Sequence, residues 1–120
     1  MSRFGHREHV HLTWRTVRSF GLPEAIDVVS DSIRSTARYA GMPQKYNATV
    51  SRAWVELVAH HVAEAEPDED FDTFLDRNPA LLDKRLLLRF YRSATLAQPQ
   101  ARTGWVEPDL APIPPAHHVN

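Results

Sequence analysis

The chain contains no cysteine, so neither disulfide bonds nor thiolate chemistry can operate in it. Its four glycines are scattered, so there is no glycine-rich loop that could cradle a phosphate group. No apolar run approaches the ~20 residues that a membrane-spanning helix needs. A basic excess, which nucleic-acid-binding chains of this size usually carry, is also missing, because the formal net charge is −1. We therefore expect neither a membrane nor a nucleic acid as a partner.

What is present is typical of a globular chain. Hydrophobic residues make up 42% of the sequence and charged residues 24%, which is ordinary for a single domain of 120 residues. A chain of this length can bury a sizeable core without disulfide or metal staples. The first residues lack the apolar core of a secretion signal, so we expect the protein in the cytoplasm.

Hydrophobic periodicity predicts an all-α fold, a compact bundle of about three main helices followed by short C-terminal helices and an extended arm. The main helices are expected at residues 5–20, 23–40 and 44–65 or 47–65. Gly21 stands where the first helix should end, and Gly41 and then Pro43 should end the second. Asn47 is a good N-cap for the third helix, whose wide apolar face predicts that it is central.

The C-terminal half is predicted to be more broken. Short helices are expected at residues 71–75, 79–82, 83–91 with a break at Asp83, and 93–96. Five prolines from Pro99 onward argue against any regular helix there, so we divide the chain into a helical domain, 1–97, and a proline-rich arm, 98–120. Trp105 on this arm needs a surface to bury it. We therefore expect the arm to dock on its own domain or on the partner subunit of a homodimer.

The stretch from Phe4 to Trp14 is the densest in groups that can do chemistry. His6 and His9 are one helical turn apart and border the buried side of the first helix, while His11, Arg15 and Arg18 should face solvent. With His61 and Glu64 on the third helix, the first two histidines could form a metal site. The spacing departs from known metal-binding motifs, however. Hydrogen-bonded, half-buried histidines are the preferred interpretation, so we expect no metal and no cofactor.

A second group of residues combines aromatic and cationic side chains, the types that dominate peptide recognition sites. The candidate substrate-binding residues are Arg7, Trp14, Lys45, Tyr46, Arg89, Tyr91, Arg102 and Trp105. Arg85, Arg89 and Arg92 are expected to form an exposed basic edge. The second helix, with Arg34 and Arg38 away from its apolar stripe, is interpreted as purely structural.

Several segments resemble a small bacterial family that carries no generic enzyme signature. They are Phe4-x-x-Arg7-Glu8-His9-x-x-Leu12-x-Trp14, Lys45-Tyr46, Arg52-Ala53-Trp54, Leu81-Leu82-Asp83-Lys84 and Ala101-Arg102-x-x-Trp105-Val106-Glu107-Pro108-Asp109-Leu110. In size and general make-up the chain is similar to the small tailoring proteins of cinnamycin- and duramycin-type lantibiotic clusters.

This resemblance implies a cofactor-independent enzyme that acts on a modified precursor peptide. The implied reaction joins a lysine amine to a dehydroalanine, forming a lysinoalanine cross-link largely by holding the peptide in a reactive geometry. His9 or Glu8 could serve as a general base. Two alternatives remain open from the residues alone: a dimeric binding or structural module without chemistry, and a metal-dependent enzyme that uses His6, His9, His61 and Glu64.

Overall fold

The first two helices form an antiparallel hairpin around a glycine. In the computed structural model, which describes residues 5–42 and 45–115, helix α1 spans His6–Phe20 and helix α2 spans Leu22–Tyr39. Gly21 between them has a φ of 81° and donates its N–H to the carbonyl of Val17. Glycine adopts this left-handed conformation without a steric cost, so the predicted helix end at Gly21 is confirmed.

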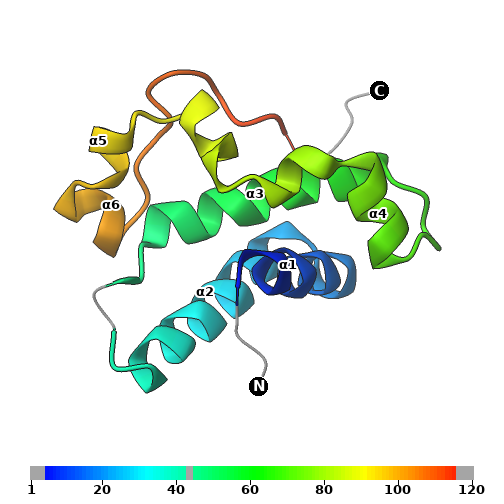
Figure 1. The fold of residues 1–120 in the computed structure, drawn as a ribbon, viewed down its shortest axis with the longest axis horizontal. Coiled ribbons are helices and arrows are strands. Elements are labelled where there is room, and N and C mark those ends of the chain that lie inside the picture. The colour runs from blue at the N-terminus through cyan, green and yellow to red at the C-terminus, as the bar shows by residue number, and fades with distance from the viewer. Residues whose placement is uncertain (1–4, 43–44, 116–120) are drawn as a thin grey trace.

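Helix α3, Ala48–Glu64, lies across both members of this hairpin (Figure 1). As predicted, Asn47 is its N-cap, and the Asn47 side chain accepts a hydrogen bond from the Val50 amide at 2.9 Å. Trp54, Leu57 and Val58 of α3 are buried in one core cluster, and Val55 and Ala59 in another. The all-α fold with three main helices is therefore confirmed, and α3 is the central helix.

Shorter elements cover one side and one end of α3. They are the α-helix Phe71–Arg77 (α4), the 3₁₀-helices Pro79–Leu82 (η2) and Lys84–Arg89 (η3), and the α-helices Ser93–Leu96 (α5) and Pro99–Thr103 (α6). The predicted break at Asp83 is present, where the carboxylate accepts a hydrogen bond from the Arg85 amide. The segment after it is 3₁₀ where an α-helix was expected, and Leu88 within it is 43% exposed.

The prediction that no helix follows Pro99 is also wrong. Pro99 is the first residue of α6, where its fixed φ suits a helix start and its missing N–H is not needed. From Gly104 onward the described chain has no regular secondary structure. This segment, 104–115, is called the arm below. It lies against its own domain, because Trp105 and Ile113 pack on the core cluster that contains Trp54.

Phe4, the expected helix boundary at Pro43 and Gln44, and the last five residues of the predicted arm lie outside the described residues. Among the residues that are described, no helix is long and apolar enough to cross a membrane.

Candidate functional site

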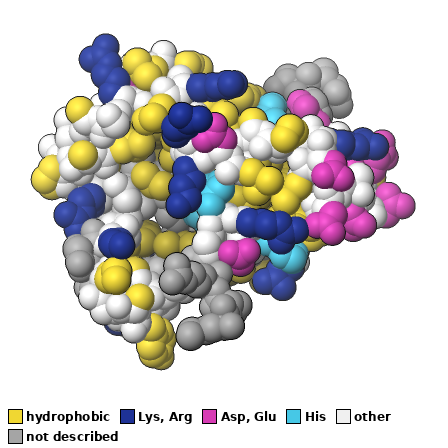
Figure 2. Space-filling view, viewed as in Figure 1, with side chains coloured by type: hydrophobic (Ala, Val, Ile, Leu, Met, Phe, Trp, Pro, Cys, Tyr) yellow, Lys and Arg dark blue, Asp and Glu magenta, His cyan; other side chains and the backbone are white. Residues whose placement is uncertain are grey.

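A cleft of about 470 Å³ opens beside the start of α1. It is called the histidine cleft below. Its lining combines an apolar floor with two imidazoles and two cationic side chains, and the residues are Gly5, His6, His9, Ile33, Val50, Trp54, Lys84, Arg85, Leu87, Leu88 and Leu96. Figure 2 shows histidine side chains on this face of the molecule, with Lys and Arg side chains beside them and hydrophobic side chains exposed nearby. Apolar clefts with a few polar groups are typical of ligand sites.

His6 is held in a defined orientation at this cleft. Its ring lies 4.5 Å from the Trp54 ring and 6.4 Å from the His9 ring, measured between centroids. The His6 Nε2 is 2.7 Å from the carbonyl oxygen of Leu81. A carbonyl can only accept a hydrogen bond, so Nε2 must carry the proton. Burial lowers the pKa of His6, which favours the neutral ring.

His9 lies deeper than His6 and is more strongly perturbed. Burial, with a smaller contribution from the neighbouring His6, lowers the pKa of His9 from 6.5 to about 4. The imidazole is therefore neutral at pH 7. A neutral ring offers one hydrogen-bond donor and one acceptor, but its affinity for a proton is low. This distinguishes His9 from a general base tuned to neutral pH.

Glu8 and Arg7 do not line the histidine cleft. The Glu8 carboxylate accepts a hydrogen bond from the Gly5 amide at 2.9 Å, which caps the start of α1. Arg7 forms an ion pair with Asp72 at 2.8 Å, and its guanidinium lies 5.1 Å from the centre of the Phe71 ring. Both side chains thus stabilise α1 and its contact with α4.

Arg15 and Arg18 are exposed, as predicted, whereas His11 is only partly exposed. The His11 ring stacks on Phe71, with centroids 4.1 Å apart and planes 7° apart. Arg18 lies 4.7 Å from the centre of the Trp14 ring and donates hydrogen bonds to the carbonyls of Glu69 and Pro67. Trp14 itself packs on the core cluster, so this face of α1 holds α4 and the loop before it.

The structure does not assemble the hypothetical metal site. His61 is on the last turns of α3, where burial lowers its pKa and the Asn78 side chain bonds to it. Glu64 lies 3.8 Å from His60, not from the α1 histidines. Within residues 5–42 and 45–115 there is no group of three or more His, Asp or Glu side chains placed to hold a metal ion.

Two of the predicted binding residues, Tyr46 and Arg102, meet in a different cleft, of about 600 Å³. It is called the arginine cleft below. Its lining consists of Arg34, Arg38, Tyr46, Ala48, Pro99, Arg102 and Thr103. Helix α2, which the sequence indicated as purely structural, thus contributes two arginines to it. Lys45 lines a smaller hollow of about 210 Å³ together with Tyr46.

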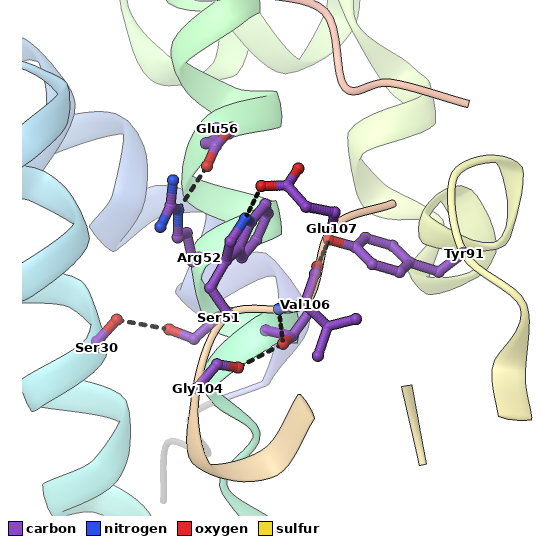
Figure 3. Close-up of polar contacts among 10 residues, drawn as sticks. Ser30, Ser51, Arg52, Glu56, Tyr91, Gly104, Val106 and Glu107 are labelled. Atoms are coloured by element: carbon purple, nitrogen blue, oxygen red, sulfur yellow. Dashed lines mark hydrogen bonds and ion pairs between the residues drawn. The ribbon is translucent and has the colours of Figure 1, made fainter. Parts of the chain in front are cut away.

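The other predicted binding residues are separated. Tyr91 is fully buried, and its hydroxyl donates a 2.6 Å hydrogen bond to the Val106 carbonyl (Figure 3). Trp105 is partly buried and donates its Nε1–H to Glu107 at 3.0 Å, with the Arg52 guanidinium 4.1 Å from its ring centre. Arg89 is exposed on η3 and lines neither cleft. Tyr91 and Trp105 therefore hold the arm against the helical domain.

Sequence reasoning missed several residues of the histidine cleft. Lys84 and Arg85 reach it from η3, and Ile33 reaches it from α2. The basic edge predicted at Arg85 was the one available signal.

No family model, no curated protein and no solved structure matches this chain.

Proposed function

We propose that this protein binds a modified precursor peptide in the histidine cleft and promotes formation of a lysinoalanine cross-link there. The proposal is supported by two neutral imidazoles in a mainly apolar cleft: His6 and His9 have lowered pKa values, and the His6 ring contacts the Trp54 ring. Neutral polar groups in an apolar cleft suit a compact, largely apolar cyclic peptide. The reaction itself is implied by the resemblance to lantibiotic tailoring proteins.

The proposed reaction needs no external reactant. The lone pair of a neutral lysine amine attacks the β-carbon of dehydroalanine and forms a carbon–nitrogen bond. The electrons of the carbon–carbon double bond move toward the adjacent carbonyl, giving an enolate. The nitrogen then loses a proton and the α-carbon gains one, so the peptide's mass is unchanged. Holding both ends of the peptide within reach of each other supplies much of the acceleration.

The charges at the cleft assist the first of these steps. Among the described residues of its lining, Lys84 and Arg85 are the cationic ones and none is acidic; Asp83 offsets only the charge of Arg85, at 3.4 Å. Nearby positive charge and removal from water both lower the pKa of a bound lysine ammonium. More of the amine is then neutral and able to attack, as in other enzymes that activate lysine nitrogen.

The low pKa of His9 changes the role that we assign to it. A ring with a pKa of about 4 is too weakly basic to take a proton from an ammonium group. A neutral imidazole can instead donate a hydrogen bond to the oxygen on which enolate charge develops. We therefore assign His9 the role of an electrophilic donor in place of general base.

The test is incubation of the purified protein with a thioether-bridged precursor peptide that contains one dehydroalanine. Cross-linking consumes the dehydroalanine, so the fraction of peptide that still adds a thiol, measured by mass spectrometry, should fall with time. The His9→Leu variant, whose side chain has no hydrogen-bond donor, should slow this loss by about a hundredfold, the usual effect of removing one such donor. Exposed Arg15 outside the cleft provides the matched control Arg15→Gln. Thiol reactivity that persists as long as in protein-free samples would reject the enzyme proposal.

A second candidate function is peptide binding without chemistry. It is favoured because the described residues that line the histidine cleft include no carboxylate that could act as a strong base. Binding of the same peptide with unchanged thiol reactivity would support this alternative. A homodimer formed through the arm and a cytoplasmic location stay predictions, and gel filtration with light scattering would test the first.

A further inference from the structure

The arginine cleft gathers positive charge from two elements that are far apart in the sequence. Arg34 and Arg38 are four residues apart on α2 and therefore share one face of that helix. Arg102 comes from α6, more than sixty residues later in the chain. All three line the cleft, and none of the described residues in its lining is acidic.

The nearby acids neutralise only part of this charge. Asp31 forms an ion pair with Arg34, with a nitrogen–oxygen distance of 2.9 Å. Arg38 forms no ion pair with any residue in the described part of the chain. Like charges four residues apart on a helix repel each other, and the fold adds a third arginine to them. A bound anion would relieve this repulsion.

Two further features orient the cationic surface. The Arg34 guanidinium lies 5.5 Å from the centre of the Tyr46 ring, a position in which ring and cation attract each other. Ala48, which also lines the cleft, is the first residue of α3, so the N-terminus of that helix borders the cleft. The Thr103 hydroxyl is a further polar group in the lining.

We propose that the arginine cleft binds a phosphate dianion, either free or carried as the monoester of a small molecule. Asp31 pairs with Arg34 only, so the lining keeps positive charge at Arg38, which favours an anion such as a phosphate group, a dianion above its second pKa of about 6. Guanidinium groups form paired hydrogen bonds with phosphate oxygens and keep their charge at every relevant pH. The cleft shares no lining residue with the histidine cleft, so this activity goes beyond the peptide reaction.

The test is titration calorimetry at pH 7.5 with inorganic phosphate and, separately, with phenyl phosphate. Acetate at matched ionic strength serves as the monoanion control. Saturable phosphate binding that exceeds acetate binding is expected. Arg38→Gln and Arg102→Gln should each weaken it about tenfold, as expected for loss of one charge-assisted hydrogen bond. Arg15→Gln removes the same charge from the exposed face of α1 and should leave the affinity unchanged.

The two ligands identify the source of the phosphate. Tighter binding of phenyl phosphate would indicate an organic monoester, and equal binding would indicate the free ion. Circular dichroism at 222 nm checks that each variant is folded, and Arg38→Lys, which keeps the charge, should recover part of the affinity. The proposal is overturned if neither ligand binds saturably, if acetate binds as well, or if Arg15→Gln weakens binding as much as the cleft variants do. None of these results depends on peptide cross-linking.

Discussion

His9 is the residue whose chemistry the fold changes most. Its pKa is about 4 in the folded protein, against 6.5 for an exposed histidine. As the pH falls below 6.5, the unfolded chain takes up the proton first, so folding becomes less favourable until the folded ring also titrates. The stabilisation is therefore complete above about pH 6.5 and is lost between pH 6.5 and pH 4. The gap between the two pKa values corresponds to about 3 kcal/mol.

We predict that His9→Gln flattens this pH dependence. Glutamine keeps polar atoms in a side chain of similar size but has no proton to gain in this range. Urea unfolding at pH 7, 5.5 and 4 measures the free energy of unfolding at each pH. His6, His11 and His61 also have lowered pKa values, so the variant should retain a weaker slope of the same sign. Equal slopes in variant and wild type would contradict the assignment.

Tyr91 illustrates a residue whose predicted role and structural role differ. The sequence indicated a binding aromatic, but its side chain is completely buried and its hydroxyl bonds to Val106 of the arm. Burial also raises the pKa of the Tyr91 hydroxyl. Removing the hydroxyl in Tyr91→Phe leaves the Val106 carbonyl without this donor. We expect a loss of about 1–2 kcal/mol in the free energy of unfolding, measured with urea at pH 7. An unchanged midpoint would show that water satisfies this carbonyl.

At the scale of elements, Asn47 joins two helices. Its side-chain oxygen caps α3, and its Nδ2 donates a 2.8 Å hydrogen bond to the Leu96 carbonyl at the end of α5. We predict that Asn47→Ala destabilises the protein by about 1–2 kcal/mol, the usual cost of a lost cap with an additional hydrogen bond. Asn47→Asp is the matched comparison, because a carboxylate still caps the helix but cannot donate to Leu96. In thermal unfolding it should lie between wild type and Asn47→Ala, and an Asp variant no better than the Ala variant would contradict the capping role.

The main helices could be predicted because their signals are local. Apolar spacing, the glycine at position 21 and the cap at Asn47 act within a turn or two of the chain, so the three expected ranges agree closely with α1, α2 and α3. Helix α6 was not predicted, because proline interrupts a helix in its interior but is favourable at the first position, which Pro99 occupies. The leucine-rich sequence of η3 does not distinguish its 3₁₀ geometry from an α-helix.

The sites were less predictable than the helices because each cleft joins elements that are distant in sequence. His6 and His9 were identified from their helical spacing, and both line one cleft. The partners of Tyr46 and Arg102 were missed. The charge on α2 looks like an ordinary solvated face until α6 is placed beside it. A periodic pattern indicates which face of a helix is polar, but it does not indicate which other helix will pack next to that face.

At the scale of the whole molecule, charge is unevenly distributed although the net charge is small. Figure 2 shows acidic side chains gathered at the α4 end of the molecule, whereas Lys and Arg side chains are spread over the remainder of this face. Among the described residues, neither cleft has an acidic residue in its lining. A ligand with negative charge would therefore be favoured at either cleft, more strongly at low ionic strength.

The arm is the other feature of the whole molecule, and Thr49 is central to its docking. The Thr49 hydroxyl donates to the Gly104 carbonyl at 2.6 Å and accepts from the Val106 amide at 3.1 Å. Further along, the Leu110 amide donates to the Phe90 carbonyl, and the Asp109 carboxylate bonds to Arg92 and Thr95. Thr49 of α3 thus satisfies two backbone groups near the start of the arm. The hydrogen bonds of Asp109 and Leu110 lie farther along the arm.

We predict that Thr49→Val releases the arm without unfolding the three main helices. Valine keeps the shape of threonine but removes the hydroxyl, leaving two backbone groups without their partner at a cost of about 1–3 kcal/mol. Native-state hydrogen exchange should show roughly tenfold or greater loss of protection at the Val106 and Leu110 amides, since such local openings report the stability of one segment. Amides in the middle of α3 should exchange as in wild type. Thr36→Val is the matched control, because the Thr36 hydroxyl bonds only within α2, to the Ser32 carbonyl. Loss of protection throughout α3 would instead show that the arm and the bundle unfold as one unit.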